Sequence, residues 1–509
     1  MTTKSDIEKT LWDGANTFRG KIDAANYKDY ILSMLFIKYL SDKYEELIES
    51  LKQEYKDEKR IERIKNTLPI RLKEEYTFNY LYNHRYSPEI GVLINKAMKG
   101  IEDDNQTQLK DIFRSIDFNS ESILGNPKQK NTILINLLED FKKLDLRPSK
   151  IEASNNQVPS DVLGDAFEYM IGEFASQAGK KAGSFFTPMM VSELMARLVN
   201  PQKKESIYDP TAGSGSLLIR AAKQAGIKDC SIFAQESNGS SYAMCRMNMF
   251  IHEIQDASIA WGDSLADPKH TDPNGNLMKF DNIVANMPFS QDKWADGFNQ
   301  GIENFKMTAD IDQYHRFEYG IPPSSKGDWA FLLHMIASLK DNGKMVAVIP
   351  HGVLFRGASE GKIRQKVLEE NLIDAIIGLP ENLFFGTSIP AALLVIKKHR
   401  KNNDILFIDA SKDYISDKAQ NKLTKEGIDK IVDTYKNRKE IEKYSHLATI
   451  DEIKENDYNL NITRYVDTFE EEEEVDIEAV RNDIQETEKE LNKVEKELEE
   501  CLKEILCQR

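Results

Sequence analysis

The chain has 509 residues, four cysteines and a formal net charge of −16, and this length favours about three domains. Its longest apolar run, residues 389–396, is far too short to cross a bilayer, and the N-terminus lacks the apolar stretch of a secretion signal. The cysteines lack the spacing of metal ligands or of a disulfide framework. We therefore expect a cytoplasmic protein with no metal and no membrane partner, and we expect its thiols to be buried or incidental.

Negative charge is concentrated near the C-terminus. Residues 467–509 contain 17 acidic and 6 basic residues, a balance of −11, whereas the preceding residues carry a balance of only −5. A nearly balanced body can carry local basic patches, so the total charge does not exclude a nucleic-acid partner. We expect this chain alone to bind DNA weakly.

Residues 1–150 have the pattern of a helical domain. Residues 27–40 are apolar nearly all round, which is typical of a helix buried within a small bundle. Residues 155–160 then form a polar linker, and residues 161–174 predict another helix. A flexible basic loop at 179–184 follows.

Strand and helix patterns alternate from residue 160 to residue 410. This alternation predicts an α/β domain with a mostly parallel sheet and helices on both faces. The last three strand candidates lie close together, so we expect antiparallel pairing there. The strand candidates are 207–208, 231–235, 257–261, 282–285, 345–349, 375–378, 391–396 and 405–408.

A connecting region, 411–466, precedes a long helical pattern at 475–509. Apolar residues recur in this pattern with spacings of 3 and 4, which predicts a coiled-coil seam. We favour pairing with another chain for subunit assembly, because the helix is highly charged outside its seam; a helix folded back on its own domain is the alternative. The seam consists of Ile477, Val480, Ile484, Thr487, Leu491, Val494, Leu498, Cys501 and Ile505.

Two polar segments each follow a strand candidate directly. The first is Asp-Pro-Thr-Ala-Gly-Ser-Gly-Ser at 209–216, and the second is Asn-Met-Pro-Phe at 286–289. Ligands of open α/β sheets bind at the carboxyl ends of the strands, so the two segments predict one crevice that holds two reactants. Residues 289–326 lack periodicity and leave the second segment directly. We interpret them as a loop over the site, with disorder as the alternative.

The first segment predicts a ligand that carries a nucleoside. Its turn, with Gly213, Ser214 and Gly215, lets the backbone approach a ligand closely, but it has neither dinucleotide spacing nor the lysine of a P-loop. Asp209 suits a cationic amino group, Glu236 a ribose and Asp263 an adenine amine, unless these acids only cap the following helices. An amino group, a ribose and an adenine together describe S-adenosylmethionine.

The two segments together resemble those of the amino-methylating DNA methyltransferases, which implies a Rossmann-like class I methyltransferase fold. Residues 183–188, Gly-Ser-Phe-Phe-Thr-Pro, are similar to a Thr-Pro element of that family. In the family this element contacts the cofactor, and the similarity extends that role to Thr187.

The second segment suits transfer of a methyl group to an adenine amine, whose lone pair is delocalised into the ring. Asn286 supplies a side-chain acceptor for the amine hydrogens, and the main-chain carbonyl of Met287 supplies another. Pro288 stiffens the turn, and Phe289 offers a face for a base flipped out of the DNA. The family usually has proline where this chain has Met287, so we expect activity with a less rigid tip.

Further segments resemble the modification subunits of type I restriction-modification systems. The resemblance implies N6-adenine methylation of double-stranded DNA, with sequence read by a separate specificity subunit. It also implies a second copy of this chain in the complex and a restriction subunit that cleaves DNA. The segments are 11–15, 18–20, 40–42, 327–331, 350–355, 383–387, 389–390 and 456–466.

Two other functions remain open at this point. Similar tips serve methyltransferases that act on RNA or on protein glutamine, although the helical domain and the coiled-coil pattern argue against them. A weakly active scaffold subunit is the second alternative, suggested by Met287. Phe384 or Phe385 is a further candidate for holding the flipped base, with core packing as the simpler role.

Overall fold

The structure is a computed structural model that describes residues 1–114, 116–153, 157–178, 186–226, 229–299, 301–385, 388–417, 420–468 and 477–507. The chain forms two compact units, residues 1–466 and 467–509. The predicted basic loop at 179–184 and residues 155 and 156 of the predicted linker lie outside the described residues.

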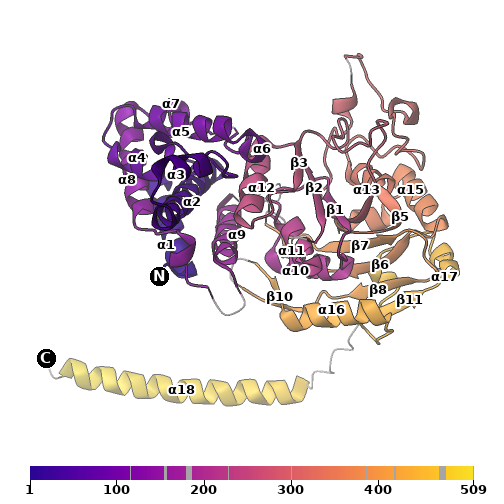
Figure 1. Ribbon diagram of the computed structural model, residues 1–509. Coiled ribbons are helices and arrows are strands. Elements are labelled where there is room, and N and C mark those ends of the chain that lie inside the picture. The colour runs from indigo at the N-terminus through magenta and orange to yellow at the C-terminus, as the bar shows by residue number, and fades with distance from the viewer. Residues whose placement is uncertain are drawn as a thin grey trace. The chain divides into compact units, whose positions relative to one another are not determined.

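The N-terminal part of the first unit is helical, as predicted, and surrounds the long helix α2 (Figure 1). The first helix begins at a capping box, in which the Thr3 hydroxyl accepts the Asp6 N–H and the Asp6 carboxylate accepts the Thr3 N–H. The predicted apolar helix forms the middle of α2, where Phe36 and Ile37 are fully buried. The helices are α1 Lys4–Phe18, α2 Ala24–Glu54, α3 Glu58–Lys65, α4 Phe78–Asn83, α5 Ile90–Asp104, α6 Gln106–Leu109, α7 Glu121–Leu124, α8 Pro127–Lys142 and α9 Pro159–Ala178.

The following residues form a mostly parallel sheet of nine strands in the order β11-β8-β6-β7-β5-β4-β1-β2-β3. Strand β7 runs antiparallel to β5 and β6, and β11 runs antiparallel to β8, so antiparallel pairing does occur at the predicted end. All eight predicted strands are present, and the short strands β9, β10 and β11 were not predicted. The strands are β1 Ser206–Asp209, β2 Ser231–Glu236, β3 Ser258–Trp261, β4 Phe280–Asn286, β5 Leu339–Pro350, β6 Ile373–Gly378, β7 Ala391–Lys397, β8 Ile405–Asp409 and β11 Ser445–Ala448, with a separate pair β9 Tyr414–Ile415 and β10 Lys422–Leu423.

Helices cover both faces of this sheet, which confirms the predicted Rossmann-like architecture (Figure 1). Side chains of α10, α11 and α16 pack on one face, and those of α13 and α15 on the other. Helix α12 faces two ways, because Cys245 and Met249 pack with the sheet while Met244 and Phe250 pack with the N-terminal helices. These helices are α10 Met189–Val199, α11 Ser216–Ala225, α12 Gly239–Ile251, α13 Asp328–Ala337, α14 Gly352–Phe355, α15 Ala358–Glu369, α16 Lys425–Asn437 and α17 Ile450–Glu455.

The described residues of the second unit include one helix, α18 Ile477–Cys507. The middle of its predicted seam is open to solvent in this single chain, where Leu491 and Leu498 are each 58% exposed. The helical prediction is confirmed, and the coiled-coil pairing stays a prediction. Within the described part of the chain, no helix combines the length and the apolar character needed to cross a membrane.

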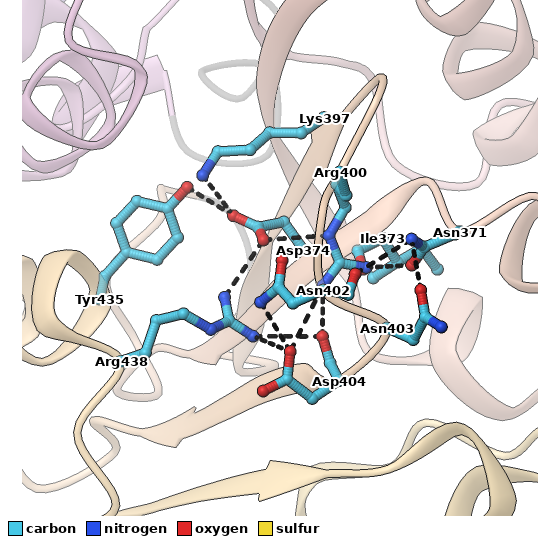
Figure 2. A network of polar contacts seen from close by, with 10 residues as sticks. All are labelled: Asn371, Ile373, Asp374, Lys397, Arg400, Asn402, Asn403, Asp404, Tyr435 and Arg438. Carbon is cyan, nitrogen blue, oxygen red and sulfur yellow. Dashed lines mark hydrogen bonds and ion pairs between the residues drawn. The ribbon is translucent and has the colours of Figure 1, made fainter.

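A buried ionic network joins β6, β7 and α16 at the edge of the sheet where β6 begins (Figure 2). The Asp374 carboxylate accepts hydrogen bonds from Tyr435 at 2.8 Å and from Arg400 and Arg438 at 3.1 Å each, and Lys397 forms an ion pair with it at 2.8 Å. Since β6 runs in the same direction as β4, this network lies at the opposite edge from the end of β4.

We expect Asp374→Asn to destabilise the protein. The substitution removes the carboxylate that Arg400, whose side chain is 1% exposed, contacts at 3.1 Å, and breaking a buried pair in this way costs about 3–5 kcal/mol. Chemical denaturation of the variant and the wild type measures the loss. Equal unfolding midpoints would contradict a stabilising role for the network.

Candidate functional site

Strands β1 and β4 lie side by side in parallel, with Ile207 opposite Asn282 and Tyr208 opposite Ile283. The chain builds β2 and β3 on one side of β1 and then returns to build β4 and β5 on the other. Such a reversal of strand order leaves a crevice at the carboxyl ends of the two central strands. The two polar segments that follow β1 and β4 meet at this point.

The glycine turn after β1 packs directly against helix α12. Gly215 has a φ of +77°, and a Cβ atom there would lie 2.8 Å from the Cys245 sulfur. Both the conformation and the space therefore require glycine. The Gly213 N–H donates to the Glu236 carboxylate at 2.9 Å, and Ser214 is buried with its hydroxyl 3.0 Å from that of Ser216.

Two acids that were predicted to bind a ligand lie together beneath this turn. Asp209 is 2% exposed and accepts the Thr211 N–H at 2.8 Å. Burial, and secondarily the charge of Glu236, raises the pKa of Asp209 to about 7. Burial also raises the pKa of Glu236, which uses one oxygen for Gly213 and the other for the Asn238 N–H at 2.7 Å. A cationic ligand bound beside this pair would stabilise the ionised form of the two carboxyl groups.

Two cavities open at this edge of the sheet. The first is narrow, about 20 Å³, and lies beside Asp209 and the glycine turn. The second, about 220 Å³, lies beside Glu236 and Asp263. Thr211 and Asn286 line both cavities. The remaining lining residues are Phe186, Thr187, Ala212, Gly213, Ser214, Ser216 and Leu217 in the first cavity and Pro210, Ser237, Asn238, Ser264, Pro288, Gln291 and Phe331 in the second.

Asp263 caps the turn that follows it and also lines the second cavity. One carboxylate oxygen accepts the N–H groups of Leu265 and Ala266, at 2.8 Å and 3.3 Å, and so caps the following turn. The side chain nevertheless lines the second cavity. Capping and ligand contact are therefore compatible at this residue.

Asn286 is held in a defined orientation by Thr187, as its side-chain N–H donates to the Thr187 hydroxyl at 3.0 Å. This contact joins segments that are 99 residues apart. It uses the amide nitrogen, so the amide oxygen takes no part in it. Residues 183–185 of the predicted Thr-Pro element lie outside the described residues.

The remaining tip residues are anchored. The Met287 side chain is 2% exposed in the core formed with α13 and β5, which argues against the looser tip expected from the loss of proline. Pro288 lines the second cavity. Phe289 is half-buried and packs edge-on against Phe384, with ring centroids 6.0 Å apart.

The residues that follow the tip do not form a loose loop along their whole length. Gln291 lines the second cavity, but Trp294 and Phe317 are buried in the core, and Arg316 pairs with Asp312 below the surface at 2.7 Å. Residues this well packed are tied to the domain. Only the first residues of the segment, as far as the structure describes it, reach the site.

Two lining residues, Ser237 and Asn238, had no signal in the sequence. They are ordinary polar residues near a turn, and only tertiary contacts bring them to the second cavity. Phe331 did have a signal, because it ends the segment 327–331. Phe384 is 6% exposed and Phe385 packs against Phe186 at 5.6 Å between ring centroids, which fits core packing for both.

Comparisons with known proteins identify relatives of this chain. Residues 158–474 match the family model "N-6 DNA Methylase", and residues 7–141 match the model "HsdM N-terminal domain". The chain is 32% identical to the type I restriction enzyme MpnII methylase subunit of Mycoplasma pneumoniae, over 94% of this chain and 93% of that protein. It is also 32% identical to the MjaVIII methylase subunit of Methanocaldococcus jannaschii, over 95% of this chain and 81% of that protein.

A solved structure shares the fold closely. The type I restriction-modification methyltransferase subunit of Streptococcus thermophilus superposes with a TM-score of 0.78 at 37% identity. The match covers 92% of this chain and all of that one.

The raised pKa of Asp209 predicts a dependence of stability on pH. Its proton is bound more tightly in the folded chain than at the usual pKa of 3.8. The carboxyl therefore stabilises the fold fully below pH 3.8, and that contribution is lost as the pH rises through about 7. Asp209→Asn removes this titration.

We expect the thermal unfolding midpoint of Asp209→Asn to lie closest to that of the wild type at about pH 4 and to exceed it at about pH 8. Calorimetry of the ligand-free proteins over this range measures the difference. A difference that stays constant with pH would contradict the raised pKa.

Proposed function

Since the chain belongs to the N-6 DNA methylase family, as a methylase subunit of type I restriction systems, we propose that the crevice between β1 and β4 is its methyl-transfer site. The reaction moves a methyl group from S-adenosylmethionine to the N6 amine of an adenine in DNA. The observation that carries this proposal is Asn286, which lines both cavities with its amide oriented by Thr187.

The site fits the cofactor in charge and in hydrogen bonding. Asp209 and Glu236 are buried carboxylates with raised pKa values, and a cation bound beside them offsets their cost. Each Glu236 oxygen already accepts one N–H, from Gly213 or Asn238, and retains a lone pair for a hydroxyl. Such a pair of acceptors suits the two hydroxyls of a ribose.

Each residue of the cofactor site then has a defined role. Asp209 binds the amino group of the methionyl part, Glu236 the ribose and Asp263 the adenine amine. Gly213, Ser214 and Gly215 bring the main chain close to the cofactor, and Thr187 contacts it from the opposite side. The narrow cavity of about 20 Å³ holds only about one water, so binding widens it.

The bound cofactor supplies an electrophilic methyl group, and the protein prepares the amine that accepts it. The Asn286 side-chain oxygen and the Met287 carbonyl accept the two hydrogens of the adenine amine and draw its lone pair out of conjugation. An asparagine cannot take a proton, so positioning and electrostatic stabilisation carry the transfer, and the methylated amine, then cationic, releases its extra proton to water. Pro288 fixes the turn, and Phe289 stacks on the flipped base.

The tip provides acceptors and a stacking face but no reader of base sequence. We propose that a separate specificity subunit selects the DNA site and that two copies of this chain join it. A restriction subunit that cleaves DNA completes the complex in the cytoplasm, where the DNA lies.

In this proposal residues 1–150 form a helical domain, 160–410 the catalytic domain and 411–466 a connecting region. The exposed seam within 475–509 forms a coiled coil during assembly.

Asn286→Ala tests the catalytic proposal. We expect transfer of labelled methyl groups to DNA, measured with the specificity subunit present, to fall at least about 100-fold, because the variant loses an acceptor for the amine. Cofactor affinity, measured by calorimetry, should change little. The matched control is Asn282→Ala on the same strand, where the amide donates to Glu205 at 2.8 Å, far from the crevice. Unchanged transfer by Asn286→Ala would exclude this site.

Substitution of the seam tests the assembly proposal. Burying two leucines contributes about 3–6 kcal/mol, so Leu491→Asp combined with Leu498→Asp should weaken subunit assembly at least about 100-fold. The control, Asn492→Asp, adds a charge beside the seam instead of within it. Light scattering of the complex with the specificity subunit measures assembly. Equal assembly by the seam variant and the control would contradict the coiled coil.

A further inference from the structure

Segments 327–331, 350–355 and 456–466, which resemble those of type I modification subunits, have no role in the methyl transfer described above. In the structure they meet behind the Asn286 tip. We propose that Asp328 is a positioning residue for methyl transfer and that it acts with Arg356 by fixing the main chain directly after Phe289. This inference rests on the proposed role of the tip.

Asp328 holds the backbone at the residue that follows the tip. Its side chain is fully buried in the first turn of α13, and one carboxylate oxygen accepts the Ser290 N–H at 2.6 Å. Ser290 has a φ of +49°, a left-handed conformation that a side chain disfavours. The Gly327 N–H donates to the Gln291 carbonyl at 2.9 Å, so two consecutive residues of the tip's continuation are fixed by one helix start.

Arg356 balances the charge of Asp328. Its guanidinium donates to the other Asp328 oxygen at 2.9 Å and forms a second ion pair with Glu360 at 3.5 Å. Gly352 leaves the space that this guanidinium occupies, because a Cβ atom there would lie 2.3 Å from the Arg356 Nε. A side chain at residue 352 would therefore displace the guanidinium from this position.

The third segment enters through Arg364. This side chain donates to the carbonyls of Arg356 at 2.9 Å and of Tyr458 at 2.8 Å. Tyr458 belongs to segment 456–466. A continuous polar path therefore runs from the connecting region, through Arg364 and Arg356, to Asp328 and the tip.

A buried carboxylate is a costly way to hold one N–H group. Water or a neutral side chain satisfies such a donor at lower cost, whereas a buried charge must be paired. The benefit of the charged arrangement is geometric, since a charge-assisted hydrogen bond fixes the N–H of Ser290 more firmly. A shift at Ser290 moves Phe289 and the Met287 carbonyl, which we place against the reacting base, and small displacements of such groups slow reactions strongly.

The test compares Asp328→Asn with Asp374→Asn in the full chain, assembled with its specificity subunit. Asp374 is the matched control, as it is a buried carboxylate held by arginines at the opposite edge of the sheet (Figure 2). Asp328→Asn should lower kcat about 10- to 100-fold, with cofactor affinity unchanged. Asp374→Asn should lower only the unfolding midpoint and leave kcat per folded enzyme unchanged.

Arg356→Gln provides a second variant, at a side chain that is 23% exposed, in case Asp328→Asn does not fold. It should reproduce the loss in kcat, and the double variant should be no slower than either single variant, because both act on one contact. An unchanged kcat in Asp328→Asn or in Arg356→Gln, or an equal loss in Asp374→Asn, would overturn the inference. Asn286→Ala separates the two proposals: if it abolishes transfer while Asp328→Asn does not, only the positioning role fails.

Discussion

The site depends on the parallel pairing of β1 with β4. This pairing ends two strands at the same edge of the sheet, although 70 residues lie between the end of β1 at Asp209 and the start of β4 at Phe280.

 The Asp209 segment and the Asn286 tip therefore lie at one cavity, although they are far apart in the sequence. Because the strand order reverses at this point, neither segment is covered by the helix that follows the other strand. The crevice, its two cavities and the placement of Asn286 between them all follow from this pairing.

The buried acids show how the site is prepared for a charged ligand. Asp209 and Glu236 lie together out of solvent, and the raised pKa of each expresses the cost of ionising it there. Backbone N–H groups from Thr211, Gly213 and Asn238 offset part of this cost. The fold thus places two carboxyl groups where ionisation is unfavourable, and a bound cation lowers the free-energy cost of ionising them.

The N-terminal helices are tied to the same region through α12. The Asn238 side chain caps this helix, and its N–H donates to Glu236 in the crevice. Two residues further on, the Ser240 hydroxyl contacts Lys28 at 2.6 Å and Asp29 at 2.8 Å in α2. The opposite faces of α12 pack on the sheet and on the N-terminal helices. The helical part is therefore fixed against the site by the helix that also holds the Glu236 end of β2.

The sequence by itself determined the fold class, the eight main strands, the glycine turn, the three acids and the Asn-x-Pro-Phe tip. These depend on local periodicity and on residues adjacent in the chain, which can be read in order. Only the tertiary structure decided that Thr187 orients Asn286, that Met287 is buried and that Asp328 with Arg356 holds Ser290. Each of these is a contact between residues far apart in sequence, whose distances and burial arise only when the sheet and its helices pack together.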